Sequence, residues 1–512
     1  MIFAVALTPA VVVAQVDQSP INLPSIDYGS ILPAVVLIGG ALLLLAVGGL
    51  SRKRPAPGTY ALVTIVTAGV ALWFSFKLWD QVDANRARTT IADAIVVDGF
   101  SVFFMVLVCA TVVLGALLAD GYLRREKLEG PEYYVLMLLS ASGGILMAQA
   151  NDLIVVFLGL EILSIALYVL AGYYRRKPAS QEAAIKYFVL GAFSSAFFLY
   201  GVALVYGATG STNLGDISGL LRERPFTNGV LLAGFAFLLV GLGFKVAAVP
   251  FHMWTPDVYQ GAPTPVTGFM AAGAKAAGFA ALLRIFFSTF GPERLDWQPI
   301  VWAMAVATLL VGSVLAIVQT DLKRMLAYSS ISHAGYVLVG LQAATDRGVA
   351  GSLFYLLAYT FMVLGSFGIV SLVGRRGDEQ HSLDTYRGLA ARRPALALVF
   401  TVFLLAQAGV PLTSGFLAKF YVIGAAVESH SYALAVIAML AAVIAAFFYL
   451  RVIVVMYMSG DASAADGAPE DPIRVPVAAG AALAVTLAFT LIVGFLPSVV
   501  VDFARNATLL RL

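Results

Sequence analysis

Apolar residues occur along the chain in blocks of about 20, which is the length a helix needs to cross the ~30 Å hydrocarbon layer of a bilayer. Short polar or basic stretches separate the blocks. The strands of membrane β-barrels alternate over roughly 10 residues instead, so the pattern argues against a barrel. It predicts an all-α polytopic membrane protein with about 14 transmembrane helices. The expected spans are 31–50, 59–79, 99–120, 131–149, 152–173, 181–207, 229–250, 266–290, 299–320, 325–342, 349–373, 395–425, 431–458 and 475–499.

Two of these spans contain proline where a helix should be continuous. The seventh reaches Pro250 and runs on into a proline-rich stretch, and the twelfth carries Gly409-Val410-Pro411 in its middle. Proline removes a backbone hydrogen bond and kinks a helix. At membrane depth this is tolerated only against protein or a wet cavity. Helices 7 and 12 are therefore predicted to be broken, at Pro250 and Pro411.

The positions of the breaks suggest an internal repeat. If helices 4–8 and 9–13 form two five-helix units, each unit has a break in its fourth helix, and units of odd helix number must be inverted relative to each other. No strong sequence identity links the two halves, so the repeat rests on hydropathy. The expected division is 1–127 for helices 1–3, 128–293 and 294–460 for the two half-channel units, and 461–512 for helix 14.

Composition and charge agree with a membrane location. Only 12% of the residues are charged and 60% are hydrophobic, whereas soluble domains are about 25% charged. The loops after odd-numbered helices hold about twice as many lysines and arginines as the other loops and the termini together. By the positive-inside rule, both termini are expected on the periplasmic side of a bacterial inner membrane.

Some basic residues fall inside the apolar spans, where a lysine at a helix centre costs ~2.5–3.5 kcal/mol. Lys77, Arg284 and Arg451 lie near span ends and are expected to extend their charged groups to the interface. For Lys186 this interpretation and an inward position are equally favoured. Lys245, Lys275 and Lys419 lie deeper, beside small residues that let helices pack closely, so their faces are expected to point inward.

Glu161 also lies in the middle of a span, and no structural rule requires a glutamate there. The protonation of a buried amine depends on nearby charge. A row of lysines near one carboxylate therefore has the properties of a proton relay. The alternative is a static ion pair of Glu161 with Lys245 that fixes helix register, but one acid cannot neutralise three lysines.

Two histidines lie close to this set. His252 follows Pro250, and His333 lies on the tenth helix. Histidine titrates near neutrality, so both suit a relay, and a structural histidine with satisfied hydrogen bonds is an equal alternative for each. His381 and His430 lie in loops and are expected to be solvated.

Several classes of site have no sequence signal. Cys109 is the single cysteine, and there is no H-E-x-x-H motif, no G-x-G-x-x-G after a strand and no P-loop lysine. No metal or cofactor site is therefore expected in this chain. The first 15 residues are apolar but lack a basic start, so they are expected to remain in the mature chain.

Two stretches resemble the antiporter-like membrane subunits of respiratory complex I. Residues 243–266 (Gly-Phe-Lys-Val-Ala-Ala-Val-Pro-Phe-His-Met-Trp-Thr-Pro-Asp-Val-Tyr-Gln-Gly-Ala-Pro-Thr-Pro-Val) are similar to the seventh-helix signature of that family, and 321–336 to its tenth-helix motif. The resemblance covers nearly the whole chain. It implies proton translocation through Glu161, Lys245, Lys275 and Lys419, with Lys186, His252 and His333 as auxiliary positions.

The same resemblance implies the partners. NADH, FMN, iron–sulfur clusters and quinone are expected in other subunits of the complex, with membrane neighbours of the M, K and J types, the lipid bilayer around the chain and no nucleic acid. A sodium/proton antiporter subunit and a static structural spacer are the alternatives. The stretch 259–266 argues against the first, because those subunits and the sister L and M subunits usually have a histidine there. Lys419 in place of a glutamate also argues against an M-type subunit.

Overall fold

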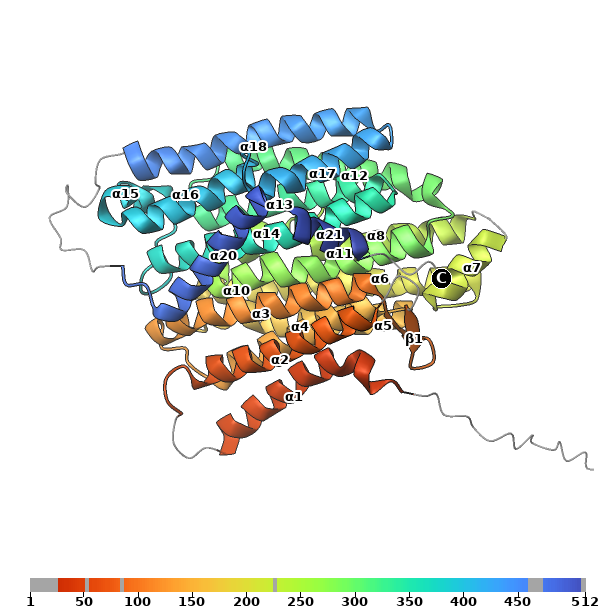
Figure 1. Ribbon diagram of the computed structural model, residues 1–512, viewed down its shortest axis with the longest axis horizontal. Coiled ribbons are helices and arrows are strands. Elements are labelled where there is room, and N and C mark those ends of the chain that lie inside the picture. The colour runs from red at the N-terminus through yellow and green to blue at the C-terminus, as the bar shows by residue number, and fades with distance from the viewer. Residues whose placement is uncertain (1–25, 51–54, 83–86, 224–227, 459–472, 508–512) are drawn as a thin grey trace, which may run out of the picture.

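The computed structural model describes residues 26–50, 55–82, 87–223, 228–458 and 473–507. Long helices with roughly parallel axes form one bundle, and they follow one another across it from α1 at one edge to α18 at the other (Figure 1). The first half comprises α1 (Tyr28–Leu50), α2 (Thr59–Gln81), α3 (Gly99–Arg125), α4 (Pro131–Gln149), α5 (Leu153–Ala171), α6 (Pro178–Thr209), α7 (Leu214–Glu223), α8 (Gly229–Val246), α9 (Trp254–Gly261), α10 (Thr264–Phe269), η1 (Met270–Ala274), α11 (Lys275–Leu283) and η2 (Arg284–Thr289).

The second half and the C-terminal helices complete the bundle. They comprise α12 (Arg294–Ile317), α13 (Leu322–Gln342), α14 (Asp346–Val373), η3 (Leu383–Tyr386), α15 (Leu389–Arg392), α16 (Pro394–Ala408), α17 (Ser414–Glu428), α18 (Tyr432–Met458), α20 (Val477–Phe495) and α21 (Ser498–Asn506). A short antiparallel hairpin of β1 (Arg88–Thr90) and β2 (Ile95–Val97) precedes α3.

Eleven helices in the described part of the chain are long and apolar enough to cross a membrane. The protein is thus a mostly helical membrane protein, as predicted. A helix lies in each of the fourteen predicted ranges, but α4, α13 and the pair α16–α17 are not among the eleven. Polar residues such as Lys323 and His333 lower the hydropathy of α13, and α16 and α17 are separated by a break. Fourteen crossings therefore remain a prediction.

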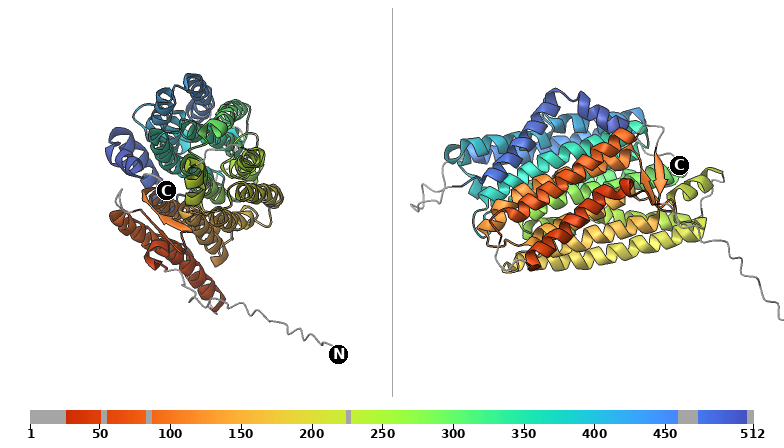
Figure 2. Two further views of the ribbon diagram at one scale, coloured as in Figure 1. Left: turned by 90° about the vertical axis from the view of Figure 1, so that its right-hand side faces the viewer. Right: turned by 60° about the horizontal axis from the view of Figure 1, so that its bottom comes forward.

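Two segments form the centre of the bundle. The apolar windows of 264–289, which runs through α10, η1, α11 and η2, and of α14 are entirely buried, whereas those of α1 and α2 at one edge are only 28% and 39% buried. The end-on view shows the other helices arranged around the centre (Figure 2). The sequence thus places Lys275, on 264–289, in the most enclosed part of the molecule.

Both predicted helix breaks are present. Helix α8 ends at Val246, and Ala247 follows in the left-handed conformation (φ 63°), donating its N–H back into the last turn. This is a common helix ending, and it comes before Pro250, which lies in the non-helical stretch 247–253. Pro411 lies in the interruption 409–413 between α16 and α17. The seventh helix therefore ends earlier than the predicted residue 250.

Two similar connections occur in the two halves of the chain. Asp152 caps the start of α5 and forms a β-bridge with Asn213, and Asp321 caps the start of α13 and forms a β-bridge with Ser382. Helix α7 follows the first bridge, and η3 and α15 follow the second. Figure 1 shows α7 and α15 at opposite ends of the bundle.

A buried ion pair ties the start of α3 to η2. Nη1 and Nη2 of Arg284 each donate to the carboxylate of Asp98 at 2.9 Å, and Arg284 also donates to the carbonyl oxygen of Ala148. The prediction that Arg284 extends to the interface was wrong: its side chain finds a bidentate partner inside the protein. Arg451 is half-buried and donates to the carbonyl oxygen of Ile317, and Lys77 is exposed.

Candidate functional site

Lys245 is the penultimate residue of α8, just before the first helix break, and its side chain is buried (5% exposed). Its Nζ donates to Ser164 Oγ (2.8 Å) on α5 and to Tyr187 OH (3.3 Å) on α6. A direct ion pair of Lys245 with Glu161, which was the alternative to a relay, is not present in the part of the chain that the structure describes. Glu161 lies one turn before Ser164 on the same helix, and its Oε1 has no hydrogen-bond partner in the described part of the chain. A hydroxyl one turn away takes the place of the carboxylate.

Lys275 is the first residue of α11 and follows the π-helical segment η1. Such segments re-aim the side chains that follow them and are frequent at functional sites. The buried Nζ donates to the carbonyl oxygen of Ser330 (2.7 Å) on α13 and to the hydroxyl of the same residue. A Cβ on Gly278 would lie 3.1 Å from Cγ of Lys245. The glycine therefore brings α11 close to the Lys245 stem.

Lys419 lies on α17, just after the second break. Its buried Nζ donates to the carbonyl oxygen of Ala408 (2.8 Å), the last residue of α16, and lies 5.0 Å from the centre of the Tyr336 ring. The C-terminus of a helix carries partial negative charge and attracts a cation. Gly409 has φ 91°, and a Cβ there would lie 2.9 Å from Cδ of Lys419, so this approach requires glycine.

His333 is also buried (4% exposed). Its Nδ1 is 2.6 Å from Tyr355 OH on α14 and its Nε2 is 3.1 Å from Tyr449 OH on α18. It lies on α13, less than one turn after Ser330, the acceptor of Lys275. The same helix thus carries contacts toward both halves of the chain. Sequence reasoning missed Tyr355 and Tyr449, since buried tyrosines in apolar helices resemble ordinary core residues.

Lys186 and His252 are only half-buried, unlike the three lysines and His333 described above. Lys186 is 41% exposed and binds Asp257 (2.8 Å) and Glu182 (2.6 Å) at one end of the bundle, where these residues line a cavity of about 270 Å³. Burial would raise the pKa of Asp257, but Lys186 and Arg324 outweigh it and lower that pKa. His252 is half-buried at the first break. The hydrogen bonds of Lys245 go to Ser164 and Tyr187 and not to His252.

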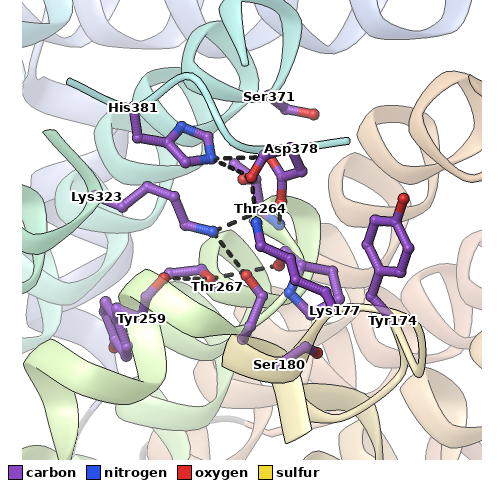
Figure 3. A network of polar contacts seen from close by, with 12 residues as sticks. Tyr174, Lys177, Ser180, Tyr259, Thr264, Thr267, Lys323, Ser371, Asp378 and His381 are labelled. Atoms are coloured by element: carbon purple, nitrogen blue, oxygen red, sulfur yellow. Dashed lines mark hydrogen bonds and ion pairs between the residues drawn. The ribbon is translucent and has the colours of Figure 1, made fainter. Parts of the chain in front are cut away.

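A second charged cluster, which the sequence did not predict, surrounds Asp378 in the loop after α14. Lys323 and His381 approach its carboxylate at 3.7 and 3.1 Å, and all three side chains are buried (Figure 3). The expectation that His381 is solvated was wrong. Lys323, which lies before the predicted span 325–342, is the second residue of α13. Burial by itself would raise the pKa of Asp378, but Lys323, His381 and Lys177 hold that pKa well below its usual range.

No group of three metal-binding side chains occurs in the ranges that the structure describes. The expectation that the chain holds no cofactor or metal stays a prediction. Lys245, Lys275, His333 and Lys419, called the buried row below, each contact neutral oxygen atoms. The first 15 residues, which were expected to remain in the mature chain, lie outside the described residues.

Known proteins resemble the chain over most of its length. Residues 150–445 match the family model described as NADH:quinone oxidoreductase/Mrp antiporter, TM. The protein named NADH-quinone oxidoreductase subunit N of Trichlorobacter lovleyi is 44% identical over 94% of this chain and 97% of its own length. Subunit N 1 of Solibacter usitatus is 44% identical over 93% of this chain and 96% of its own.

Solved structures show the same fold. A chain of respiratory complex I from Thermus thermophilus superposes with a TM-score of 0.77 at 33% identity, covering 92% of this chain and 99% of its own. A chain of the Mrp complex from Dietzia has a TM-score of 0.82 at 21% identity, covering 93% and 96%, which shows likeness of fold alone. The identities and coverage together show that this chain belongs to the NADH:quinone oxidoreductase/Mrp antiporter family and, within it, to the family of NADH-quinone oxidoreductase subunit N.

Proposed function

We propose that this chain is the proton-translocating membrane subunit of a bacterial NADH-quinone oxidoreductase. One observation carries the proposal: Lys245, Lys275 and Lys419 are buried, and each donates to a hydroxyl or carbonyl oxygen. A lysine locked in an ion pair keeps its proton, whereas a neutral acceptor lets the amine release a proton without leaving a buried carboxylate unpaired. Such groups, arranged in a row, can pass protons.

The proposed route runs from Glu161 through Lys245 and Lys275 to His333 and Lys419. Quinone reduction elsewhere in the complex changes the electric field at one end of the chain, and the Glu161–Lys245 distance responds. Lys245 then passes its proton toward Lys275, and His333, bonded at both ring nitrogens, connects Lys275 with Lys419. Moving one charge against the membrane potential costs ~2.3 kcal/mol per 100 mV, which the redox reaction supplies. Lys186 and His252 are assigned to the entrance, outside the buried row.

The proposed architecture has fourteen crossings, with inverted units 128–293 and 294–460 after the N-terminal helices and before helix 14. The β-bridges made by Asp152 and Asp321 support it, because the two aspartates occupy matching places in the two units. The elements that follow the two bridges, α7 and α15, lie at opposite ends of the bundle (Figure 1), as inversion requires. The excess of basic residues in the loops after odd-numbered helices supports periplasmic termini.

The chemistry of electron transfer is assigned to partner subunits. Relatives of this chain are named as subunits of an NADH-quinone oxidoreductase. NADH, FMN, iron–sulfur clusters and quinone are therefore proposed to reside in other subunits, with M-, K- and J-type subunits as neighbours in the inner membrane. The chain itself contributes titratable side chains and performs no redox step.

A sodium/proton antiporter subunit is the second candidate, and the fold it shares with the Mrp complex from Dietzia is the observation that favours it. The higher identity to proteins named subunit N weighs against it.

Native gel electrophoresis of mildly solubilised membranes separates the two functions. The gel is probed for this chain and the same lane is stained for NADH oxidation. Co-migration in one large band is the expected result. A band that contains the chain but lacks NADH oxidation would contradict the proposal, and sodium-dependent proton exchange would then be measured in the same membranes.

A further inference from the structure

Asp378 lies in the loop after α14 and contacts four other parts of the chain. Figure 3 shows Lys177, Thr264 and Lys323 around it. Its carboxylate accepts hydrogen bonds from Tyr122 OH on α3 (2.9 Å) and from the hydroxyl (2.7 Å) and backbone N–H (3.2 Å) of Thr264. Lys323 on α13 lies 3.7 Å away, and Lys177, just before α6, donates to the backbone carbonyl oxygen. Segments distant in sequence therefore meet at this one residue.

Thr264 is the first residue of α10, and the helix continues without a break through η1 to Lys275. The first N–H groups of a helix lack partners within the helix and need an outside acceptor. No side chain of the neighbouring turn caps α10. Asp378 supplies the acceptor from another element, and it thereby fixes the start of the helix that carries Lys275.

The same place is tied to α13. Nζ of Lys323 donates to the carbonyl oxygen of Ala262 (2.6 Å), in the turn between α9 and α10. Two turns further along α13, Ser330 accepts the hydrogen bonds of Lys275. The Lys275 helix and α13 thus touch at two points, one at the end of the bundle and one at the buried amine. A shift at the first point changes the geometry at the second.

We propose that Asp378 is a positioning residue for proton transfer: through Thr264 and Lys323 it sets the register of the Lys275 helix against α13. This inference rests on the proposed function, since it gives Lys275 a role in moving protons. It assigns a role to a loop residue that touches none of the proton-carrying side chains. It also gives a reason for the buried pair of Asp378 and Lys323, which lies outside the buried row. An apolar pair of equal volume would pack as well there.

The experiment changes the contact without changing any charge. Thr264→Val keeps the shape of the side chain and removes the hydroxyl that donates to Asp378, whereas Thr264→Ser keeps the hydroxyl. Thr267→Val is the matched control, because Thr267 lies one turn along the same buried helix and donates only to the backbone oxygens of Tyr259 and Pro263. Lys275→Ala serves as the reference for lost proton transfer. Each variant is made in the intact complex and reconstituted in vesicles.

Pumped protons per NADH oxidised are measured, with the amount of assembled complex determined separately. We expect Thr264→Val to lower the ratio roughly two- to fivefold, as loss of one buried hydrogen bond shifts Lys275, and Thr264→Ser to restore it. If Thr264→Val matches Thr267→Val while Lys275→Ala loses pumping, the positioning role is wrong and the proposed function stands. If Lys275→Ala pumps normally, the proposed function itself fails, and the positioning role with it.

Discussion

Lys419 reaches across a helix break to bind the last carbonyl oxygen of the helix before it, Ala408, at 2.8 Å. Lys245 also lies at a break, in the last turn of α8, but it turns toward the hydroxyls of α5 and α6. Two of the three buried amines are thus placed by interrupted helices. At the second break, the backbone offers Lys419 an acceptor that an unbroken helix would use internally.

Replacing Lys419 by arginine tests whether this residue acts through its positive charge or through release of its proton. Lys419→Arg keeps a cation that can bind the Ala408 carbonyl, but a guanidinium does not release its proton in proteins. We expect normal assembly and a loss of proton pumping of about tenfold. Arg451→Lys, a change of a half-buried cation bound to the Ile317 carbonyl, is the control and should pump normally. Full pumping by Lys419→Arg would remove Lys419 from the route.

The pair of Arg284 and Asp98 is expected to hold the N-terminal helices in place. Asp98→Asn leaves the buried Arg284 without its counter-charge, which costs ~3–5 kcal/mol, so we expect much less assembled complex on native gels. Asp27→Asn breaks the exposed pair with Arg88, worth ~0–1 kcal/mol, and should assemble normally. Equal assembly of the two variants would show that the buried pair is dispensable.

The Asp378 cluster gives a testable dependence on pH. A carboxyl group whose pKa is lowered by folding stabilises the protein above its unfolded value, ~3.9, and loses that contribution as the pH falls toward the folded pKa. Lys323, His381, Lys177 and Tyr122 face Asp378. Asp378→Asn should therefore lower the melting temperature of the complex, and the difference from the parent should not shrink between pH 8 and 5. A difference that vanishes in that range would mean that another group controls the cluster.

Tyr449 is expected to take part in proton transfer at His333. Its hydroxyl contacts both His333 Nε2 (3.1 Å) and Ser329 Oγ. Tyr449→Phe removes these contacts with little change of volume, and we expect pumped protons per NADH to fall severalfold. Tyr336→Phe is the matched control, since that hydroxyl donates only to the Ala438 carbonyl oxygen. Equal ratios in the two variants would place Tyr449 outside the route.

Much of the fold follows from the sequence because apolar blocks and prolines are local signals. A helix occurs in every predicted range, and Pro250 and Pro411 both lie in interruptions. The start of the first break was predicted wrongly. Ala247 ends α8 in a left-handed conformation, and an alanine gives no sequence signal for that conformation. The burial of Lys245, Lys275 and Lys419 was also predictable, since each lies deep in an apolar span.

The partners of these groups were not predictable, because they depend on how distant helices face one another. Ser164 replaced Glu161 as the contact of Lys245, and Ser330 became the acceptor of Lys275. The burial of Asp378 was not predicted, because an aspartate in a loop normally faces water. Lys323 lies beside loop residues in the sequence, yet its side chain is fully buried (0% exposed). Long-range packing, which hydropathy does not describe, decides such positions.

The most direct test of the account is the proton-to-NADH ratio of Lys245→Ala in the purified complex, reconstituted in sealed vesicles. Lys77→Ala, which removes an exposed lysine on α2, is the control for loss of one positive charge. The account predicts that both variants assemble and that Lys245→Ala alone pumps fewer protons for each NADH oxidised. An unchanged ratio in Lys245→Ala would contradict the claim that the buried amines carry the protons.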